Sequence, residues 1–206
     1  MKILNLSIIA LLLSTVIASG QKNKGIIDAK GLQVGTKAPV FYAIDADNVK
    51  FDLRESLKQG PVVIIFYRGY WCPVCNKHLK QIQDSLKLIR DKGASVVAIS
   101  PEKPEYLEKM EEKTGVKFRL LYDEGYKIAN AYDVTFTPTK SELIIYNTVL
   151  GANLKETHSD DSQRLPIPAT YLISQDGKIV WRQFDPNYKK RSSVKDIIRA
   201  IENLKK

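Results

Sequence analysis

The stretch Val62-Val63-Ile64-Ile65-Phe66-Tyr67-Arg68-Gly69-Tyr70-Trp71-Cys72-Pro73-Val74-Cys75 joins a wholly apolar run to a pair of cysteines. The run, residues 62–67, is rich in β-branched side chains and is typical of a strand buried on both faces. Residues 76–90 continue with the spacing of an amphipathic helix. The stretch therefore predicts a buried strand, a tight turn at Gly69 and two thiols at the start of a helix.

The position of these thiols predicts redox chemistry. Unpaired N–H groups and the helix dipole favour an anionic sulfur at a helix N-terminus, lowering a thiol pKa from about 8.5 toward neutrality or below. Pro73 suits the first helical turn, where its missing N–H costs no hydrogen bond. Cys72 and Cys75 are the only cysteines of the chain, so a disulfide within the chain joins these two.

The N-terminal residues have the pattern of a secretory signal peptide. Lys2 precedes an apolar run from Ile3 to Ile17, and Ala18-Ser19-Gly20 is a small-residue cleavage pattern. We predict a signal peptide over residues 1–20, a flexible segment over 21–33 and export to a periplasm or the cell exterior. The alternative is an uncleaved anchor, but the run is short for a bilayer span. We therefore expect no stable membrane insertion after cleavage.

Charge and cysteine spacing limit the other classes of function. The net charge is +9, but basic and acidic residues are mixed along the chain, with one basic cluster at 189–191. This pattern favours a solvated basic surface over a nucleic-acid site. A bridge between Cys72 and Cys75 closes a very short loop, so as a structural staple it contributes only about 1 to 2 kcal/mol. In an oxidising compartment the pair forms a disulfide unless something reduces it.

The remaining chain alternates strands and helices. We expect strands at 40–44, 49–51, 94–100, 118–121, 169–173 and 178–182, and helices at 52–59, 76–91, 104–113, around 128–132 and 194–204. This order favours an α/β fold with a central mixed sheet flanked by helices. Residues 133–166 do not fit the alternation, so we interpret them as an insertion with a helix at 141–150 and a mobile polar loop at 155–164. Residues 34–206 are expected to form one domain.

The signatures FYRGYWCPVCN, IPATYLISQDGKI and FDPNYKKR resemble the alkyl hydroperoxide reductase/thiol-specific antioxidant family, the peroxiredoxin-like branch of the thioredoxin fold. In the peroxiredoxin signature Pro-x-x-x-Thr-x-x-Cys, Cys75 takes the place of the cysteine that attacks peroxide. Cys72 takes the place of the threonine and Arg68 that of the proline. Pro168 stands about where the family has an arginine, and it matches the cis-proline that faces the dithiol in thioredoxins.

These departures leave two orders of attack open. In disulfide exchange, we expect Cys72 to be the exposed nucleophile and Cys75 to resolve the mixed disulfide. In a peroxidase cycle Cys75 becomes the sulfenic acid and Cys72 condenses with it. Both cycles end at a Cys72–Cys75 disulfide. Arg68 either stabilises a thiolate or lies on the rim, and Trp71 either docks a partner or packs under the turn.

The sequence thus predicts a thiol-dependent oxidoreductase acting in disulfide exchange or in peroxide reduction for antioxidant defence. Its partners are a thiol reductant, thioredoxin-like or membrane-bound, and a peroxide or protein disulfide. The alternative is a redox-inert binding module that keeps a permanent disulfide and docks a partner through 133–166. No cofactor is expected. His78 and His158 are the only histidines, too few to complete a zinc site, and Asn76 stands where haem attachment requires histidine.

Overall fold

The computed structural model describes residues 24–204. The predicted signal peptide, residues 1–20, lies outside the described residues. Between residues 24 and 204, no helix has the length and apolar character needed to cross a membrane.

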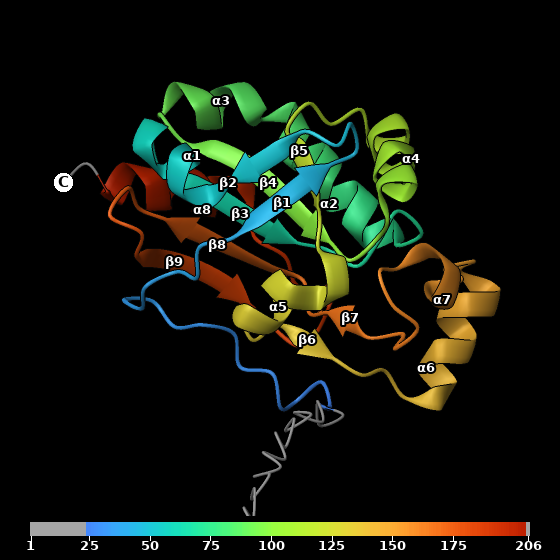
Figure 1. The fold of residues 1–206 in the computed structure, drawn as a ribbon. Helices are drawn as coiled ribbons and strands as arrows, with labels where there is room; N and C mark the ends of the chain where they lie inside the picture. Colours follow the sequence, from blue (N-terminus) through green and yellow to red (C-terminus); the bar gives the residue numbers. More distant parts are fainter. Residues whose placement is uncertain (1–23, 205–206) are drawn as a thin grey trace, which may run out of the picture.

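The predicted strand at 62–67 is an inner strand of the sheet (Figure 1). It forms β3 (Val62–Phe66) in a seven-stranded mixed sheet of order β2-β1-β5-β4-β3-β8-β9. β3 is parallel to β4 (Ser95–Ser100), which is parallel to β5 (Arg119–Tyr122), and β3 is antiparallel to β8 (Ala169–Ile173). The outer strands are β1 (Tyr42–Asp45), β2 (Lys50–Asp52) and β9 (Ile179–Phe184). The central mixed sheet and its flanking helices confirm the predicted fold class.

β3 is wholly apolar because helices cover both faces of the sheet. Val63 and Ile65 belong to one core cluster, whereas the alternate residues Ile64 and Phe66 belong to the other. The first cluster contains residues of α2 (Pro73–Asp84), α3 (Leu86–Asp91), α4 (Pro104–Thr114) and α8 (Val194–Asn203). The second contains residues of α1 (Leu53–Gln59) and α5 (Lys127–Ala131). The strand that leads to the cysteines is therefore held from both sides.

The helix expected over 76–91 is divided into α2 and α3. Ser85 separates them with a non-helical backbone (φ −111°, ψ 8°). Serine favours helix ends because its side chain competes for backbone hydrogen bonds. The division lies three turns away from the cysteines and leaves the start of α2 unaffected.

Residues 133–166 contain more structure than expected. β6 (Thr135–Phe136) pairs with β7 (Leu165–Pro166), and between them lie α6 (Lys140–Ile144), a π-helical turn (Ile145–Val149) and α7 (Leu154–Thr157). Figure 1 shows α6 and α7 together at the edge of the molecule, on the other side from α8. The helix expected at 141–150 is confirmed in outline. The prediction of a mobile loop over 155–164 is wrong for residues 155–158, because residues 155–157 belong to α7 and both Thr157 and His158 are buried.

Residues 24–33, expected to be flexible, are held against the domain. Lys24 forms an ion pair with Asp133, and the backbone N–H of Gly31 donates to the Asp133 carbonyl at 3.0 Å. Ala29 is buried in the first core cluster. The sequence pattern of this segment lacks periodicity because it packs through turns rather than through a strand or helix.

We predict that Leu79→Ala lowers the free energy of unfolding by about 2 to 5 kcal/mol, since Leu79 is completely buried on α2 and leaves a cavity. Urea unfolding followed by circular dichroism measures the change. Leu88→Ala on α3 is the control, because Leu88 is 55% exposed and should cost far less. Equal losses for the two variants would contradict this account of the core.

Candidate active site

The turn that carries the cysteines leaves β3 through Gly69. A Cβ atom at this position would lie 2.4 Å from both Glu102 Oε1 and Trp71 Nε1, so only glycine fits. The N–H of Tyr70 donates to Glu102 Oε2 at 2.9 Å, and the N–H of Cys72 donates to the Gly69 carbonyl at 3.1 Å. These bonds fix the turn just before α2 begins.

The two thiols lie at the start of α2, as predicted. Cys72 is the N-cap residue, Pro73 follows in the first turn, and Cys75 lies within that turn. Both cysteines are free, and their sulfur atoms lie 2.9 Å apart in hydrogen-bonding contact. Only a small movement therefore separates this pair from a disulfide.

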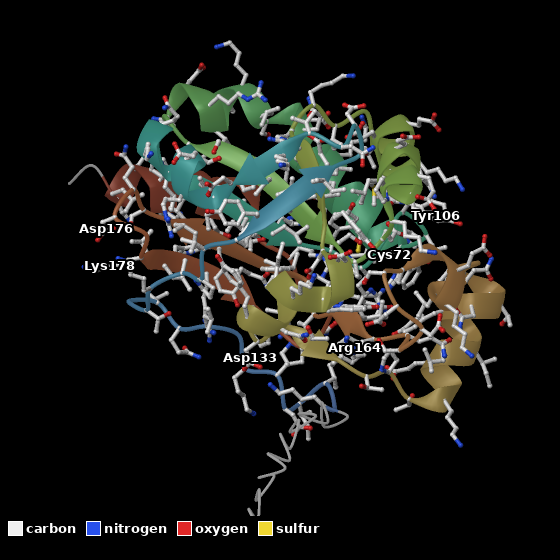
Figure 2. The ribbon with its side chains drawn as sticks, viewed as in Figure 1. Cys72, Tyr106, Asp133, Arg164, Asp176 and Lys178 are labelled. Carbon is white, nitrogen blue, oxygen red and sulfur yellow. The ribbon has the colours of Figure 1, made fainter. Side chains whose placement is uncertain are left out.

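Both sulfurs are covered. Cys72 is 0% and Cys75 1% exposed, so the expectation that Cys72 is an exposed nucleophile is wrong for this state. The sequence indicates that Cys72 lies at the outer end of the turn. It does not indicate that side chains from the insertion and from the loop after β9 pack around this position. Figure 2 shows Cys72 lying between the sheet and the insertion helices.

Arg68 is the centre of this cover. The residue is only 2% exposed, and its Nη2 donates to Cys72 Sγ at 3.3 Å. The guanidinium carbon lies 5.2 Å from the ring centre of Trp71, 5.1 Å from that of Tyr146 and 4.0 Å from that of Tyr188. Such stacking offsets part of the cost of burying the charge. Arg68 therefore contacts a cysteine sulfur, and the alternative interpretation, that it lies on the rim of the site, is wrong.

Trp71 packs under this cover and is not an exposed docking residue. Its side chain is 4% exposed, and its ring lies 5.4 Å from the ring of Tyr146. Tyr146 comes from the π-helical turn of the insertion, which therefore forms part of the site. Irregular turns of this kind occur often at functional sites.

The loop after β9 supplies a second cation. Arg191 Nη2 lies 3.6 Å from Cys75 Sγ, and Tyr188 of the same loop stacks on Arg68. The FDPNYKKR signature, residues 184–191, thus places one aromatic ring and one guanidinium against the dithiol. Each sulfur has an arginine of its own.

The charge distribution favours a thiolate at Cys75. Burial alone would raise the pKa of Cys75, but the hydrogen bond with Cys72 and the charges of Arg191 and Arg68 outweigh it and lower the pKa to about 5. The pKa of Cys72 is raised, because its hydrogen bond to Cys75, burial and the charge on Cys75 all favour the protonated thiol. Both shifts place negative charge more favourably on Cys75 than on Cys72.

Pro168 differs from its expected conformation. There is no cis peptide bond between residues 24 and 204, so the bond after Ile167 is trans and the cis-proline prediction is wrong. Pro168 is buried next to Ala169, which pairs with Phe66 at the end of β3. This pairing places Pro168 next to the end of β3, where the cysteine turn begins. Matching the sequence to thioredoxins locates the proline but does not predict whether its peptide bond is cis or trans.

Glu102 is a site residue that the sequence analysis missed. It is completely buried, its Oε2 accepts from Tyr70, and its Oε1 makes no hydrogen bond. Burial raises its pKa well above the usual range, and the negative charge of Cys75 adds to that effect. Its position in the sequence could have indicated this role. Glu102 follows β4 and the cysteine turn follows β3, and these two parallel strands end at the same edge of the sheet.

Tyr146 was missed as well, because it comes from a distant segment and carries no spacing signal. Tyr188 and Arg191 lie in the FDPNYKKR signature, but no role at the dithiol was assigned to them. His78 is buried and its Nε2 lies 3.1 Å from the Ser192 carbonyl oxygen; burial and the charge of Arg191 lower its pKa to about 4. Within the described part of the chain, no group of three or more potential ligand residues comes together to hold a metal ion.

The comparisons with known proteins agree with this geometry. The chain matches the AhpC/TSA family over residues 34–182, and it belongs to that family. It is 30% identical over 155 residues to a putative peroxiredoxin of Mycobacterium tuberculosis, covering 75% of this chain and 86% of that protein. It is 24% identical over 174 residues to the thiol-disulfide oxidoreductase ResA of Bacillus anthracis, covering 84% and 82%.

Solved structures show the same fold. Peroxidoxin BcpB from Mycobacterium tuberculosis superposes with a TM-score of 0.65 at 19% identity, over 84% of this chain and 98% of that one. The reduced 2-Cys peroxiredoxin of Plasmodium vivax gives a TM-score of 0.64 at 22% identity, over 84% and 82%. Family, relatives and fold together support a thiol-dependent oxidoreductase of peroxiredoxin-like thioredoxin fold.

We predict that Arg68→Met raises the pKa of the reactive thiol by about 1 to 3, because a cation in contact with the dithiol is lost. The rate of alkylation by iodoacetamide, measured against pH, gives this pKa. Arg90→Met is the control, since Arg90 lies on α3 and its guanidinium donates to the Lys117 carbonyl. An unchanged alkylation midpoint in Arg68→Met would show that Arg68 does not stabilise the thiolate.

We predict that Glu102→Gln removes a pH dependence of stability. The folded-state pKa of Glu102 is raised, so the folded protein binds more protons than the unfolded chain above pH 4.5, and stability falls as pH rises. The fall is up to about 1.4 kcal/mol per pH unit. Urea unfolding at pH 5 and pH 8 should show wild type losing stability relative to Glu102→Gln.

Glu105→Gln on the exposed side of α4 is the control for this comparison and should follow wild type. The prediction is refuted by parallel curves for wild type and Glu102→Gln.

Proposed function

We propose that this protein is a thiol-dependent peroxidase that cycles between the Cys72–Cys75 dithiol and its disulfide, with Cys75 as the attacking thiolate. The observation that carries the proposal is the buried pair of sulfur atoms, which lie 2.9 Å apart, with Arg68 in contact with Cys72 and Arg191 in contact with Cys75. The family and its peroxiredoxin relatives support the same reaction class.

The oxidation proceeds in two balanced steps. The Cys75 thiolate attacks the terminal oxygen of a hydroperoxide ROOH; an S–O bond forms, the O–O bond breaks, and the departing RO⁻ takes up a proton to give ROH. Cys72 then attacks the sulfur of the Cys75 sulfenic acid, forming the disulfide, while the hydroxyl leaves with a proton as water. Two thiols are oxidised and one peroxide is reduced.

Burial of the sulfurs favours peroxide over a protein disulfide as the oxidant. Disulfide exchange with a protein requires in-line access to a sulfur, and Cys72 and Cys75 are covered by Arg68 and its three aromatic partners. A peroxide is small enough to enter with slight movement of that cover. Of the two cycles that the sequence leaves open, this consideration favours peroxide reduction.

Arg68 is equipped to stabilise the reaction. Its Nε and Nη1 atoms are buried and make no hydrogen bond, so their three N–H groups remain to donate to an oxygen atom. We propose that they bind the peroxide and the departing oxygen, where negative charge develops. Arg68 thus takes a role at the position where the family signature has proline.

Disulfide exchange is the second candidate. It is favoured by the contact between the two sulfurs and by the relative named thiol-disulfide oxidoreductase. A redox-inert module with a permanent disulfide is the remaining alternative; a Cys72–Cys75 potential below about −300 mV would support it. We also propose export, based on the signal-like residues 1–20, and an external thiol reductant that restores the dithiol.

We predict that Cys75→Ser abolishes rapid reaction with hydrogen peroxide, whereas Cys72→Ser keeps one fast oxidation and then stops at the sulfenic acid. Stopped-flow fluorescence of Trp71 and mass spectrometry of the trapped sulfenic acid measure these steps. Wild type should react far faster than a free thiol. If Cys72→Ser loses the peroxide reaction and Cys75→Ser retains it, Cys72 is the nucleophile and the disulfide-exchange candidate is preferred.

A further inference from the structure

A groove of about 580 Å³ lies beside the dithiol. It is formed by the first turns of α2 and by the loop that leads into α8, and its charged lining residues are Lys77, Lys189 and Arg191. His78 also lines it, but its lowered pKa keeps it neutral and its Nε2 is engaged with Ser192. The positive charge of the groove therefore comes from the two lysines and the arginine.

These three cations lack acidic partners. None of them forms an ion pair within residues 24–204, and no aspartate or glutamate from that part of the chain lines the groove. Lysines nearby are different, since Lys80 pairs with Asp84 and Lys190 pairs with Asp185. A concave surface with several uncompensated cations attracts an anionic ligand.

Arg191 connects the groove to the reactive sulfur. One side of its guanidinium reaches Cys75 Sγ at 3.6 Å through Nη2, while its Nη1 atom is buried and has no hydrogen-bond partner. A ligand held by Lys77 and Lys189 therefore lies next to the residue that touches Cys75. Arg68 and its aromatic partners do not line the groove, so Arg191 links the groove to Cys75 from a different side.

We propose that this groove binds the reductant, and that the reductant is a small thiol carrying carboxylate groups. This inference rests on the proposed thiol cycle, in which the disulfide must be restored from outside. The covered sulfurs disfavour a bulky protein reductant, and the three cations in the lining favour carboxylates over an uncharged ligand. A thioredoxin-like reductant, the partner that the family resemblance implies, is the competing outcome.

The reductive step balances with two thiols. The first, as RS⁻, attacks Cys75 Sγ; a new S–S bond forms, the Cys72–Cys75 bond breaks, and Cys72 leaves as a thiolate beside Arg68 and takes up a proton. The second RS⁻ attacks the R sulfur of the mixed disulfide, giving RSSR and the Cys75 thiolate. Two thiols are oxidised to one disulfide, and the protein disulfide is reduced.

Three thiols of matched size test the preference: 3-mercaptopropionate, 2-mercaptoethanol and cysteamine, which are anionic, neutral and cationic. The oxidised protein is mixed with each, and the rate of reduction is divided by the rate of the same thiol with bis(2-hydroxyethyl) disulfide. We expect the normalised rate to be highest for 3-mercaptopropionate, and its advantage to fall with added salt. The double variant Lys77→Glu/Lys189→Glu should lose about fivefold or more of that advantage.

The double variant Lys80→Glu/Lys87→Glu is the matched control, because it changes net charge equally on lysines that do not line the groove and that pair with Asp84 and Asp91. Equal normalised rates for the three thiols, or equal losses in both double variants, would overturn the proposal. A reductant protein that acts while none of the small thiols shows a charge preference would do so as well.

A second measurement does not depend on thiol chemistry. Glutarate, an unreactive dicarboxylate, is titrated into the isotope-labelled oxidised protein, and the amide resonances of residues 77–81 and 189–193 are followed. We expect saturable shifts in wild type and in the control, and none in Lys77→Glu/Lys189→Glu. Absence of binding refutes the groove even if the peroxidase cycle holds, whereas binding without a 3-mercaptopropionate advantage refutes its assignment to the reductant.

Discussion

The contact between a buried guanidinium and a buried sulfur is the interaction on which the site depends. Arg68 is almost fully withdrawn from water, which is costly for a charge unless it is compensated. Compensation comes from Cys72 and from three aromatic rings, one on the cysteine turn, one in the insertion and one in the loop after β9. Three segments far apart in sequence are thereby brought to one cation, and the same packing that tolerates the charge excludes water from the dithiol.

This family member has unfamiliar residues at its signature positions. The family signature places a threonine and a proline where this chain has Cys72 and Arg68. Here the second sulfur supplies the hydrogen bond to Cys75 and the guanidinium supplies the charge, with Arg191 adding a second cation from the C-terminal side. The lowered pKa of Cys75 thus comes from groups other than those of the family signature.

Much of this could be predicted from the sequence where the signal was local. The continuous apolar run 62–66 reflects a strand that is buried on both faces, and the spacing of apolar residues in α2 reflects a helix that is buried on one face. These two patterns identify the strand, the helix and the thiols between them. Exposure could not be predicted in that way. The cover of Cys72 depends on Tyr146 and Tyr188, whose contacts are tertiary, and the isomer of the bond before Pro168 is set by packing around it. The position of Glu102 near the cysteine turn could have been predicted, since the parallel strands β3 and β4 end at the same edge of the sheet, but no sequence motif marks this residue.

The distance between the two sulfurs has a consequence for damage under oxidative stress. In the proposed cycle the sulfenic acid of Cys75 forms with its resolving thiol already in contact, so no unfolding of the helix start or approach of a second subunit has to precede condensation. A second peroxide molecule must enter the covered site before that condensation if it is to drive the sulfur on to the irreversible sulfinic acid. In that cycle, proximity of the two sulfurs therefore protects Cys75, because condensation with Cys72 competes with further oxidation.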